Sequence, residues 1–91
     1  MDFEWDPEKS EATLNNRGFD FRFASFVFLD PFRLEREDLR RNYGERRYQT
    51  IGEIDGQTYF VVFTKRGRRT RIISARRAHD NEDRAYRARQ A

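Results

Sequence analysis

The chain has 91 residues, of which 38% are charged and 36% hydrophobic, and its formal net charge is +3. This length predicts one domain over residues 1–91, and nine Phe argue against disorder because each buried ring removes about 150–250 Å² from water. The absence of Cys excludes disulfides and thiolate metal sites, and the longest apolar run, residues 59–63, is far shorter than the roughly 18 residues of a membrane span. An acidic start without an apolar segment predicts no signal peptide, so we expect a cytoplasmic protein that does not act at a membrane.

The first part of the chain contains clear signals for a strand and a helix. The segment "DFEW", residues 2–5, is typical of a short strand. Asp6 has the properties of a helix cap, and Pro7 suits the first position of a helix. This helix should end at about Arg17, because Gly18 is a typical residue after a helix end.

Residues 21–29, "FRFASFVFL", are predicted to form a second helix that contributes to the core, with Asp20 as its cap. Phe23, Phe26 and Val27 recur at the spacing of one helical face. A strand over the same residues is the alternative, since phenylalanine suits sheets equally well.

The second half of the chain is expected to form a sheet. Residues 31–45 are strongly charged and should connect the second helix to it, with a short strand at their start. Three strands are then predicted, over residues 46–54, 57–65 and 70–76. Asp55-Gly56 between the first two is a strong hairpin signal.

A charged helix over residues 80–90 completes the predicted order, β-α-α-β-β-β-α. This order predicts an α+β fold in which the helices pack on one face of a small antiparallel sheet. In the last strand, Ile72 and Ile73 would serve opposite faces, and arginines would crowd the two ends. We therefore expect a positively charged rim around a sheet edge, which suits a phosphate backbone.

Positive charge is concentrated in the second half of the chain. Residues 1–45 carry 11 acidic and 7 basic residues, whereas residues 46–91 carry 5 acidic and 12 basic residues. Of the 19 basic residues 17 are Arg, whose planar guanidinium suits phosphate. Residues 68–82 alone contain five Arg, which requires an acidic surface of the same chain or an anionic partner. An arginine-rich proteome is the alternative explanation of the composition.

Several motifs of the chain resemble the BrnT family of bacterial toxins. They are "FEWDPEK" at the start, "YGERR" at 43–47, "VVFTKRG" at 61–67, "RIISARRA" at 71–78, and Glu82 with Tyr86. The resemblance implies a small ribonuclease of a type II toxin–antitoxin pair, with a RelE-like fold. It also implies a tightly bound antitoxin, BrnA, which is a ribbon-helix-helix protein whose dimer binds operator DNA. Many members have Lys-His-Gly where this chain has Asn16-Arg17-Gly18, so Arg17 would have to supply the charge of that histidine.

The residue types present limit the possible chemistry. One His without an HExxH motif gives no metal site, and the absence of a P-loop and of GxGxxG predicts no cofactor. Ser74 near His79 is not a Ser-His-Asp arrangement, and a two-histidine ribonuclease mechanism needs a second His. RNA cleavage by the substrate's own 2′-hydroxyl remains, and it needs a base and dense positive charge around the phosphorus.

Four residues are the candidates for this cleavage. Glu45 is the candidate base and lies beside Arg47 in the sequence. Arg76 would stabilise the charge of the transition state, and His79 would protonate the leaving oxygen because imidazole exchanges protons near neutral pH. Each has a structural alternative, with Glu45 as a turn carboxylate paired with Arg47 and His79 as a solvated residue before a helix.

The candidates for RNA binding are basic side chains and one aromatic ring: Arg17, Arg46, Lys65, Arg66, Arg71, Arg77 and Tyr86. Tyr86 would either stack on an unpaired base or pack against the protein, whereas Tyr48 is expected to pack. Stacking on bases is typical of proteins that bind single strands.

These observations predict a toxin that cleaves RNA without a metal ion and thereby inhibits translation. A BrnA-type antitoxin would neutralise it by laying an acidic segment against residues 65–77, and operator DNA would be bound only through that antitoxin. The alternatives are a non-catalytic, arginine-rich binding module and an inhibitor of DNA gyrase, as ParE-like relatives of the fold are.

Overall fold

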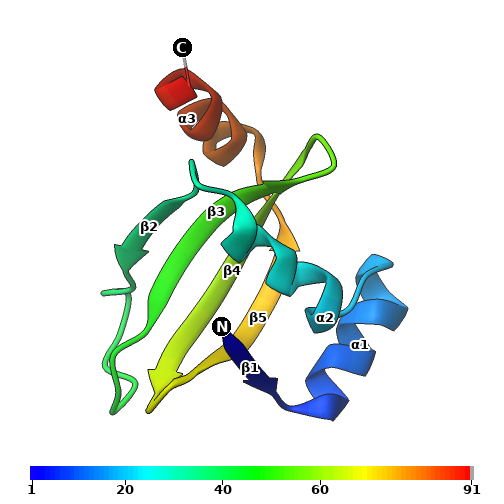
Figure 1. Ribbon diagram of the computed structural model, residues 1–91, viewed down its shortest axis with the longest axis vertical. Helices are drawn as coiled ribbons and strands as arrows, with labels where there is room; N and C mark the ends of the chain where they lie inside the picture. The colour runs from blue at the N-terminus through cyan, green and yellow to red at the C-terminus, as the bar shows by residue number, and fades with distance from the viewer. Residues whose placement is uncertain (91) are drawn as a thin grey trace.

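A five-stranded sheet is the centre of the computed structural model, which describes residues 1–90 (Figure 1). The strands lie in the order β1-β5-β4-β3-β2. In chain order the elements are β1 (Asp2–Trp5), α1 (Pro7–Arg17), α2 (Phe21–Ala24), the 3-10 helix η1 (Ser25–Leu29), β2 (Leu34–Glu37), β3 (Tyr48–Ile54), β4 (Gln57–Arg66), β5 (Arg69–Arg77) and α3 (Asp80–Gln90). The α+β class and the order of elements are as predicted, and β2 is the short strand expected in the charged connection. No helix within residues 1–90 is long and apolar enough to cross a membrane.

Local hydrogen bonds begin and end α1 where the sequence predicted. The Asp6 carboxylate accepts from the backbone N–H of Glu8 at 2.9 Å. At the other end, Gly18 has a φ of 85° and its N–H donates to the carbonyl of Leu14. Glycine adopts this left-handed conformation without steric cost, so the chain turns directly from α1 towards α2.

The segment predicted as the second helix is helical, but it consists of two different helices. The Asp20 carboxylate accepts from the N–H of Phe23 at 2.9 Å to begin α2, and η1 continues it. The strand alternative is therefore wrong. The predicted core face is right only in part, because Val27 is buried but Phe26 is 50% exposed. Three residues per turn in η1, in place of 3.6, rotate the side chains so that Phe28 is buried instead.

The predicted hairpin is present, but the sheet is mixed rather than antiparallel. β3 and β4 pair antiparallel across Asp55 and Gly56, which adopt φ angles of 50° and 84°. In contrast, β1 pairs parallel to β5, with Phe3 opposite Thr70. A parallel pair needs a long connection, which the segment from α1 to β4 provides. Hydrophobic alternation within a strand does not specify its neighbours, so the sequence pattern did not predict this pair.

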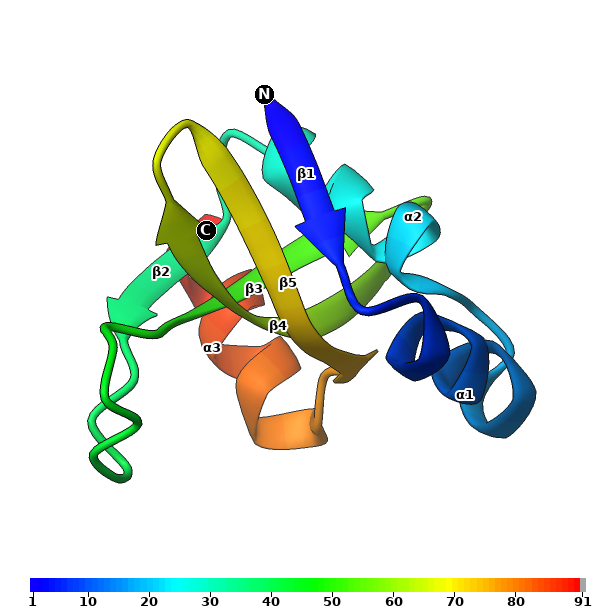
Figure 2. The ribbon, with the colours of Figure 1, turned by 90° about the horizontal axis from the view of Figure 1, so that it is seen from below.

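The helices cover both faces of the sheet, which corrects the expectation that they pack on one face. α2 and η1 lie on the face that carries Tyr59, Val61 and Phe63, whereas α3 lies on the opposite side (Figure 2). The hydroxyl of Thr58 donates to Asp83 of α3 at 2.8 Å. The pattern of a helix shows that one of its faces is buried, but not which face of a sheet it covers.

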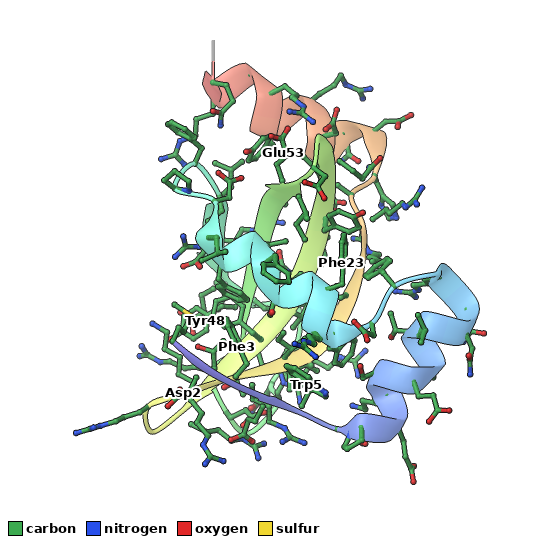
Figure 3. The ribbon with its side chains drawn as sticks, turned by 45° about the vertical axis from the view of Figure 1, so that its right-hand side comes forward. Asp2, Phe3, Trp5, Phe23, Tyr48 and Glu53 are labelled. Carbon is green, nitrogen blue, oxygen red and sulfur yellow. The ribbon has the colours of Figure 1, made fainter. Side chains whose placement is uncertain are left out.

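The hydrophobic core lies between the sheet and the α2–η1 segment. Its buried side chains are Phe19, Phe21, Ala24, Val27, Phe28, Tyr59, Val61, Phe63, Ile72 and Ala75. Phe3, Trp5 and Tyr48 are partly buried and pack against this cluster (Figure 3). Gly52 permits the close approach of η1 to β3, because a Cβ atom there would lie 3.0 Å from the Cβ atom of Val27. Aromatic rings thus supply much of the apolar area of a small core.

α3 is held to the end of the β3–β4 hairpin by polar contacts. The buried Tyr86 donates its hydroxyl hydrogen to Asp30, and Arg87 pairs with Glu53, which lies beside α3 (Figure 3). Burial, together with the hydrogen bond to Asp30, raises the pKa of Tyr86 to about 12. For Asp30 itself burial opposes ionisation, but hydrogen bonds from Tyr86 and from the N–H groups of Glu53 and Phe32 outweigh it and lower its pKa. These contacts fix the position of α3 relative to the sheet.

Candidate functional site

The arginine-rich segment forms an internal strand, and acids of the same chain neutralise part of its charge. Because β1 pairs with β5, this segment does not lie at the edge of the sheet, where the sequence placed it. Glu4 of β1 pairs with Arg71 at 2.7 Å and lies 3.9 Å from Arg69. The acidic first half of the chain therefore supplies compensation for Arg71, which was predicted to bind RNA.

Four of the predicted site residues meet at the C-terminal end of β5. They line an open cavity of about 520 Å³, whose side chains are Arg17, Phe19, Arg76, Arg77 and His79. We refer to the three arginines and the histidine as the Arg76 cluster. Arg17 comes from the last turn of α1, and its guanidinium donates to the carbonyl of Ala75 at 2.7 Å. Within residues 1–90, neither Arg17 nor Arg77 forms an ion pair, so both charges are available to a ligand.

Glu82 joins two members of the Arg76 cluster, and sequence reasoning missed it. Its carboxylate accepts two hydrogen bonds from Arg76, at 2.8 and 2.9 Å, and one from the backbone N–H of His79 at 2.7 Å. The hydrogen bond from Arg76 lowers the pKa of Glu82, although burial opposes this change. The Arg76 guanidinium also lies 4.1 Å from the centre of the Phe60 ring. The missed signal was the position of Glu82 three residues after His79, which is the spacing of a capping box.

The other two candidate catalytic residues lie in the loop before β3, near the opposite end of β4. Glu45 pairs with Arg47 at 3.3 Å and with Arg66 at 3.5 Å. We refer to these three residues as the Glu45 group. The Arg47 guanidinium lies 4.2 Å from the centre of the Tyr43 ring. Glu45 therefore forms the ion pair with Arg47 that we expected if it were a turn carboxylate rather than a base.

A buried carboxylate orders the loop that carries the Glu45 group. Asp38 accepts hydrogen bonds from the Arg40 guanidinium at 2.9 and 2.7 Å and from the Tyr43 hydroxyl at 3.3 Å. Its own N–H donates to the carbonyl of Arg47 at 2.7 Å. The hydrogen bonds from Arg40 hold the pKa of Asp38 well below its ordinary value, despite burial. The loop is thus closed by contacts at both of its ends.

The Arg76 cluster and the Glu45 group are too far apart to act on one phosphate. Arg76 lies opposite Phe60 on β4, whereas Glu45 contacts Arg66, six residues farther along that strand. At about 3.3 Å per residue, this separation along the strand is about 20 Å. Of the four predicted catalytic residues, Arg76 and His79 therefore lie in the Arg76 cluster, whereas Glu45 and Arg47 lie at the other place.

The predicted RNA-binding side chains are divided in the same way. Arg17 and Arg77 belong to the Arg76 cluster. Arg66 belongs to the Glu45 group, and Arg46 precedes Arg47 in the same loop, where its carbonyl accepts from the Thr64 hydroxyl. Lys65, the neighbour of Arg66, lies with its ammonium nitrogen 5.7 Å from the centre of the Tyr48 ring. Basic side chains therefore flank both ends of β4.

The two tyrosines considered for base stacking are both packed against the protein. Tyr48 stacks on Phe63 with 5.5 Å between the ring centres, as expected. Tyr86 is 3% exposed and hydrogen-bonded to Asp30, which corrects its assignment to RNA binding. Its buried ring presents no face on which a base could stack.

The Arg76 cluster places guanidinium donors and an imidazole around an open space. Guanidinium groups bind phosphate oxygens in a bidentate manner, and imidazole moves protons near neutral pH. Nowhere in residues 1–90 do three His, Asp or Glu side chains come together as metal ligands. The arrangement can bind a phosphate group and deliver a proton to one of its oxygens.

Comparison with known families identifies a match over most of the chain. The family model of BrnT, the ribonuclease toxin of type II toxin–antitoxin systems, matches residues 5–82. This range includes the Arg76 cluster, the Glu45 group and Glu82. A comparison with curated proteins found no match.

Proposed function

Because the chain belongs to the BrnT family of ribonuclease toxins of type II toxin–antitoxin systems, we propose that it is an endoribonuclease that cleaves RNA at the Arg76 cluster without a metal ion. The observation that carries this proposal is the open cavity in which three arginines meet one histidine. Arg17 and Arg77 have no acidic partner within residues 1–90, so a phosphate does not have to displace one. Family membership implies the RNA substrate, and the cavity supports the proposed location of cleavage.

The 2′-hydroxyl of the RNA is the nucleophile in the proposed reaction. Its oxygen bonds to the adjacent phosphorus while the bond from phosphorus to the 5′ oxygen of the next nucleotide breaks. Negative charge grows on the phosphorane-like transition state, where Arg17, Arg76 and Arg77 stabilise it. His79 donates a proton to the leaving 5′ oxygen, and the proton of the 2′-hydroxyl passes to water in the open cavity. The products are a 2′,3′-cyclic phosphate and a 5′-hydroxyl.

We assign the Glu45 group to binding RNA away from the cleaved bond. Glu45 was the predicted base, but about 20 Å along β4 separates it from Arg76. With Lys65 and Arg46 nearby, this group would hold backbone phosphates several nucleotides from the reaction. A single strand bound at both places would run along β4.

Family membership implies an antitoxin. We propose that this antitoxin is of the BrnA type, a ribbon-helix-helix protein. The toxin would then contact operator DNA only through the antitoxin. Arginines without acidic partners favour bidentate contacts with carboxylates. An acidic antitoxin segment laid against residues 65–77 would therefore also reach Arg77 and exclude RNA from the cavity. Released from it, the toxin would inhibit translation by cleaving RNA.

Analysis of cleavage products in EDTA tests the proposed reaction. Purified protein incubated with RNA should release fragments that end in 2′,3′-cyclic phosphate and begin with 5′-hydroxyl. Intact RNA that is nevertheless bound would favour the non-catalytic binding module. Intact and unbound RNA, with inhibition of DNA supercoiling, would favour the gyrase inhibitor.

A further inference from the structure

We propose that a groove beside the Arg76 cluster holds one nucleobase of the RNA, next to the phosphate that is cleaved; this inference rests on the proposed function. The groove is lined by residues of β2, β3, β4 and the first turns of α3. α3 lies on the side of the sheet away from α2 (Figure 2). Its volume is about 220 Å³. The lining side chains that matter here are Arg36, Gln49, Ile51, Phe60, Asn81 and Glu82.

The groove and the Arg76 cluster share a wall. Phe60 lines the groove, and the Arg76 guanidinium lies 4.1 Å from the centre of its ring. Glu82 also lines the groove while its carboxylate accepts both hydrogen bonds from Arg76. A phosphate bound by Arg76 therefore lies beside the groove, and the base of an adjoining nucleotide is within reach of it.

Gln49 lines the groove, and the NH₂ group of its side chain has no partner within residues 1–90. Its side chain is only 5% exposed, and its Oε1 atom accepts from the Arg36 Nε atom at 2.8 Å. A guanidinium has only donors, so the atom that faces Arg36 must be the oxygen and the NH₂ group is the free end. Within residues 1–90 that NH₂ group has no hydrogen-bond acceptor. Because this NH₂ group lines the groove and is not buried, it can donate a hydrogen bond to an acceptor of a ligand.

The rest of the groove suits a base rather than a phosphate. Asn81, on the opposite wall, has an exposed amide that forms no hydrogen bond within residues 1–90. Amide side chains recognise the edges of bases, since they carry a donor and an acceptor side by side. Ile51 and Phe60 form an apolar floor, which can pack against a base as in proteins that bind single strands. The amides of Gln49 and Asn81 above the apolar side chains of Ile51 and Phe60 match the polar edge and the flat face of a base. A phosphate alone would need no apolar contact.

Titration of the isotope-labelled full chain with short RNA tests this assignment by nuclear magnetic resonance. Trinucleotides with 2′-O-methyl groups are the probes, because the blocked nucleophile prevents cleavage, and the four probes differ only in the central base. The side-chain NH₂ signals of Gln49 and Asn81 should shift to an extent that depends on this base. Those of Gln57 and Gln90, which lie outside the groove, should not move. An abasic probe should leave all four signals in place.

The outcomes separate this inference from the proposed function. Shifts of the Arg17 and Arg77 signals without shifts of Gln49 and Asn81 would overturn the base site and leave the phosphate site standing. Base-dependent shifts of the two amides would support the base site even if RNA stayed intact in EDTA, which would overturn the cleavage alone. Shifts of the amides with the antitoxin but with no RNA probe would make the groove a protein docking site and overturn the inference.

Two substitutions extend the test to cleavage. In Gln49→Leu and in Asn81→Ala, the preference among the four bases should fall about fivefold, as the loss of one neutral hydrogen bond predicts. Gln57→Leu is the matched control and should keep the preference. If Gln49→Leu does not fold, the test rests on Asn81→Ala, because Asn81 is exposed. An unchanged preference in folded Asn81→Ala, together with unshifted amide signals, would overturn the assignment.

Discussion

Arg76 and Glu82 form a two-point ion pair, with nitrogen–oxygen distances of 2.8 and 2.9 Å, where β5 passes into α3. The two side chains are 27% and 17% exposed, so water screens the pair only in part. The pair gives the Arg76 guanidinium one orientation and uses much of its charge. Arg17 and Arg77 are then the members of the Arg76 cluster whose charge has no counterpart within residues 1–90.

Replacing Glu82 by Gln should destabilise the protein by about 1.5–3 kcal/mol at neutral pH, since hydrogen bonds to a charged group are lost. The pKa of Glu82 is lowered from its ordinary value of 4.5, so the folded protein binds this proton less tightly than the unfolded chain. The stabilisation is therefore complete above about pH 4.5 and is lost as the pH falls through the lowered pKa. Urea unfolding at neutral pH and at about pH 3 measures it. A difference between wild type and Glu82→Gln that does not shrink in acid would contradict the assignment.

Tyr86→Phe should destabilise the protein by about 1–3 kcal/mol, because the partly buried Asp30 loses a hydrogen-bond donor. Tyr43→Phe removes a longer hydrogen bond to Asp38, at 3.3 Å, and should cost less. RNA affinity should be unchanged in Tyr86→Phe, since the Tyr86 ring is buried. Thermal unfolding and a binding titration measure the two effects. Weaker RNA binding by folded Tyr86→Phe would restore this residue to the RNA-binding set.

The elements that could be predicted are those with signals only a few residues long. Asp6 and Gly18 act on the backbone next to them, and Asp55-Gly56 supplies the two positive φ angles of a tight turn. The parallel pair of β1 and β5 joins residues more than 60 positions apart in the sequence. Neither strand contains a local sequence signal for this pairing. The side of the sheet that α3 covers depends on contacts such as Thr58 with Asp83, which appear only in the folded chain.

The site was predicted as a set of residues but not as an arrangement. Arg17, Arg76, Arg77 and His79 do meet, because α1 ends beside the end of β5. Glu45 does not join them, since a strand of several residues lies between the two places and the sequence carries no information on that distance. The spacing of His79 and Glu82 indicates a capping contact, but it carries no sign that Glu82 also pairs with Arg76. Arg76 becomes the neighbour of Glu82 only through the turn between β5 and α3.

RNA affinity should fall as salt rises, with a slope in a log–log plot of about −0.7 for each phosphate neutralised. In Arg77→Ala the slope should be smaller in magnitude by about 0.7, because one phosphate contact is lost. Fluorescence titration of a single-stranded RNA at several salt concentrations provides both slopes. A flat response of the wild type would remove nucleic acid as a ligand of this surface.

Co-expression with the adjacent open reading frame should yield a toxin–antitoxin complex that survives about 0.5 M salt, a concentration that screens exposed charges strongly. Exposed ion pairs contribute only about 0–1 kcal/mol each, so a stable complex must bury apolar surface as well. Size-exclusion chromatography at low and high salt measures this. Relief of toxicity without any complex would contradict the proposed docking.

The most direct test of the central claim is the rate of RNA cleavage in EDTA for wild type, Arg77→Ala and Arg89→Ala. Arg89 lies in the last turn of α3 and does not line the cavity, so the two variants change net charge equally and differ only in place. If the Arg76 cluster stabilises the transition state, Arg77→Ala should lose about a hundredfold or more in rate, whereas Arg89→Ala should cleave like the wild type. A folded Arg77→Ala protein that cleaves RNA at the wild-type rate would place the reaction elsewhere on the molecule.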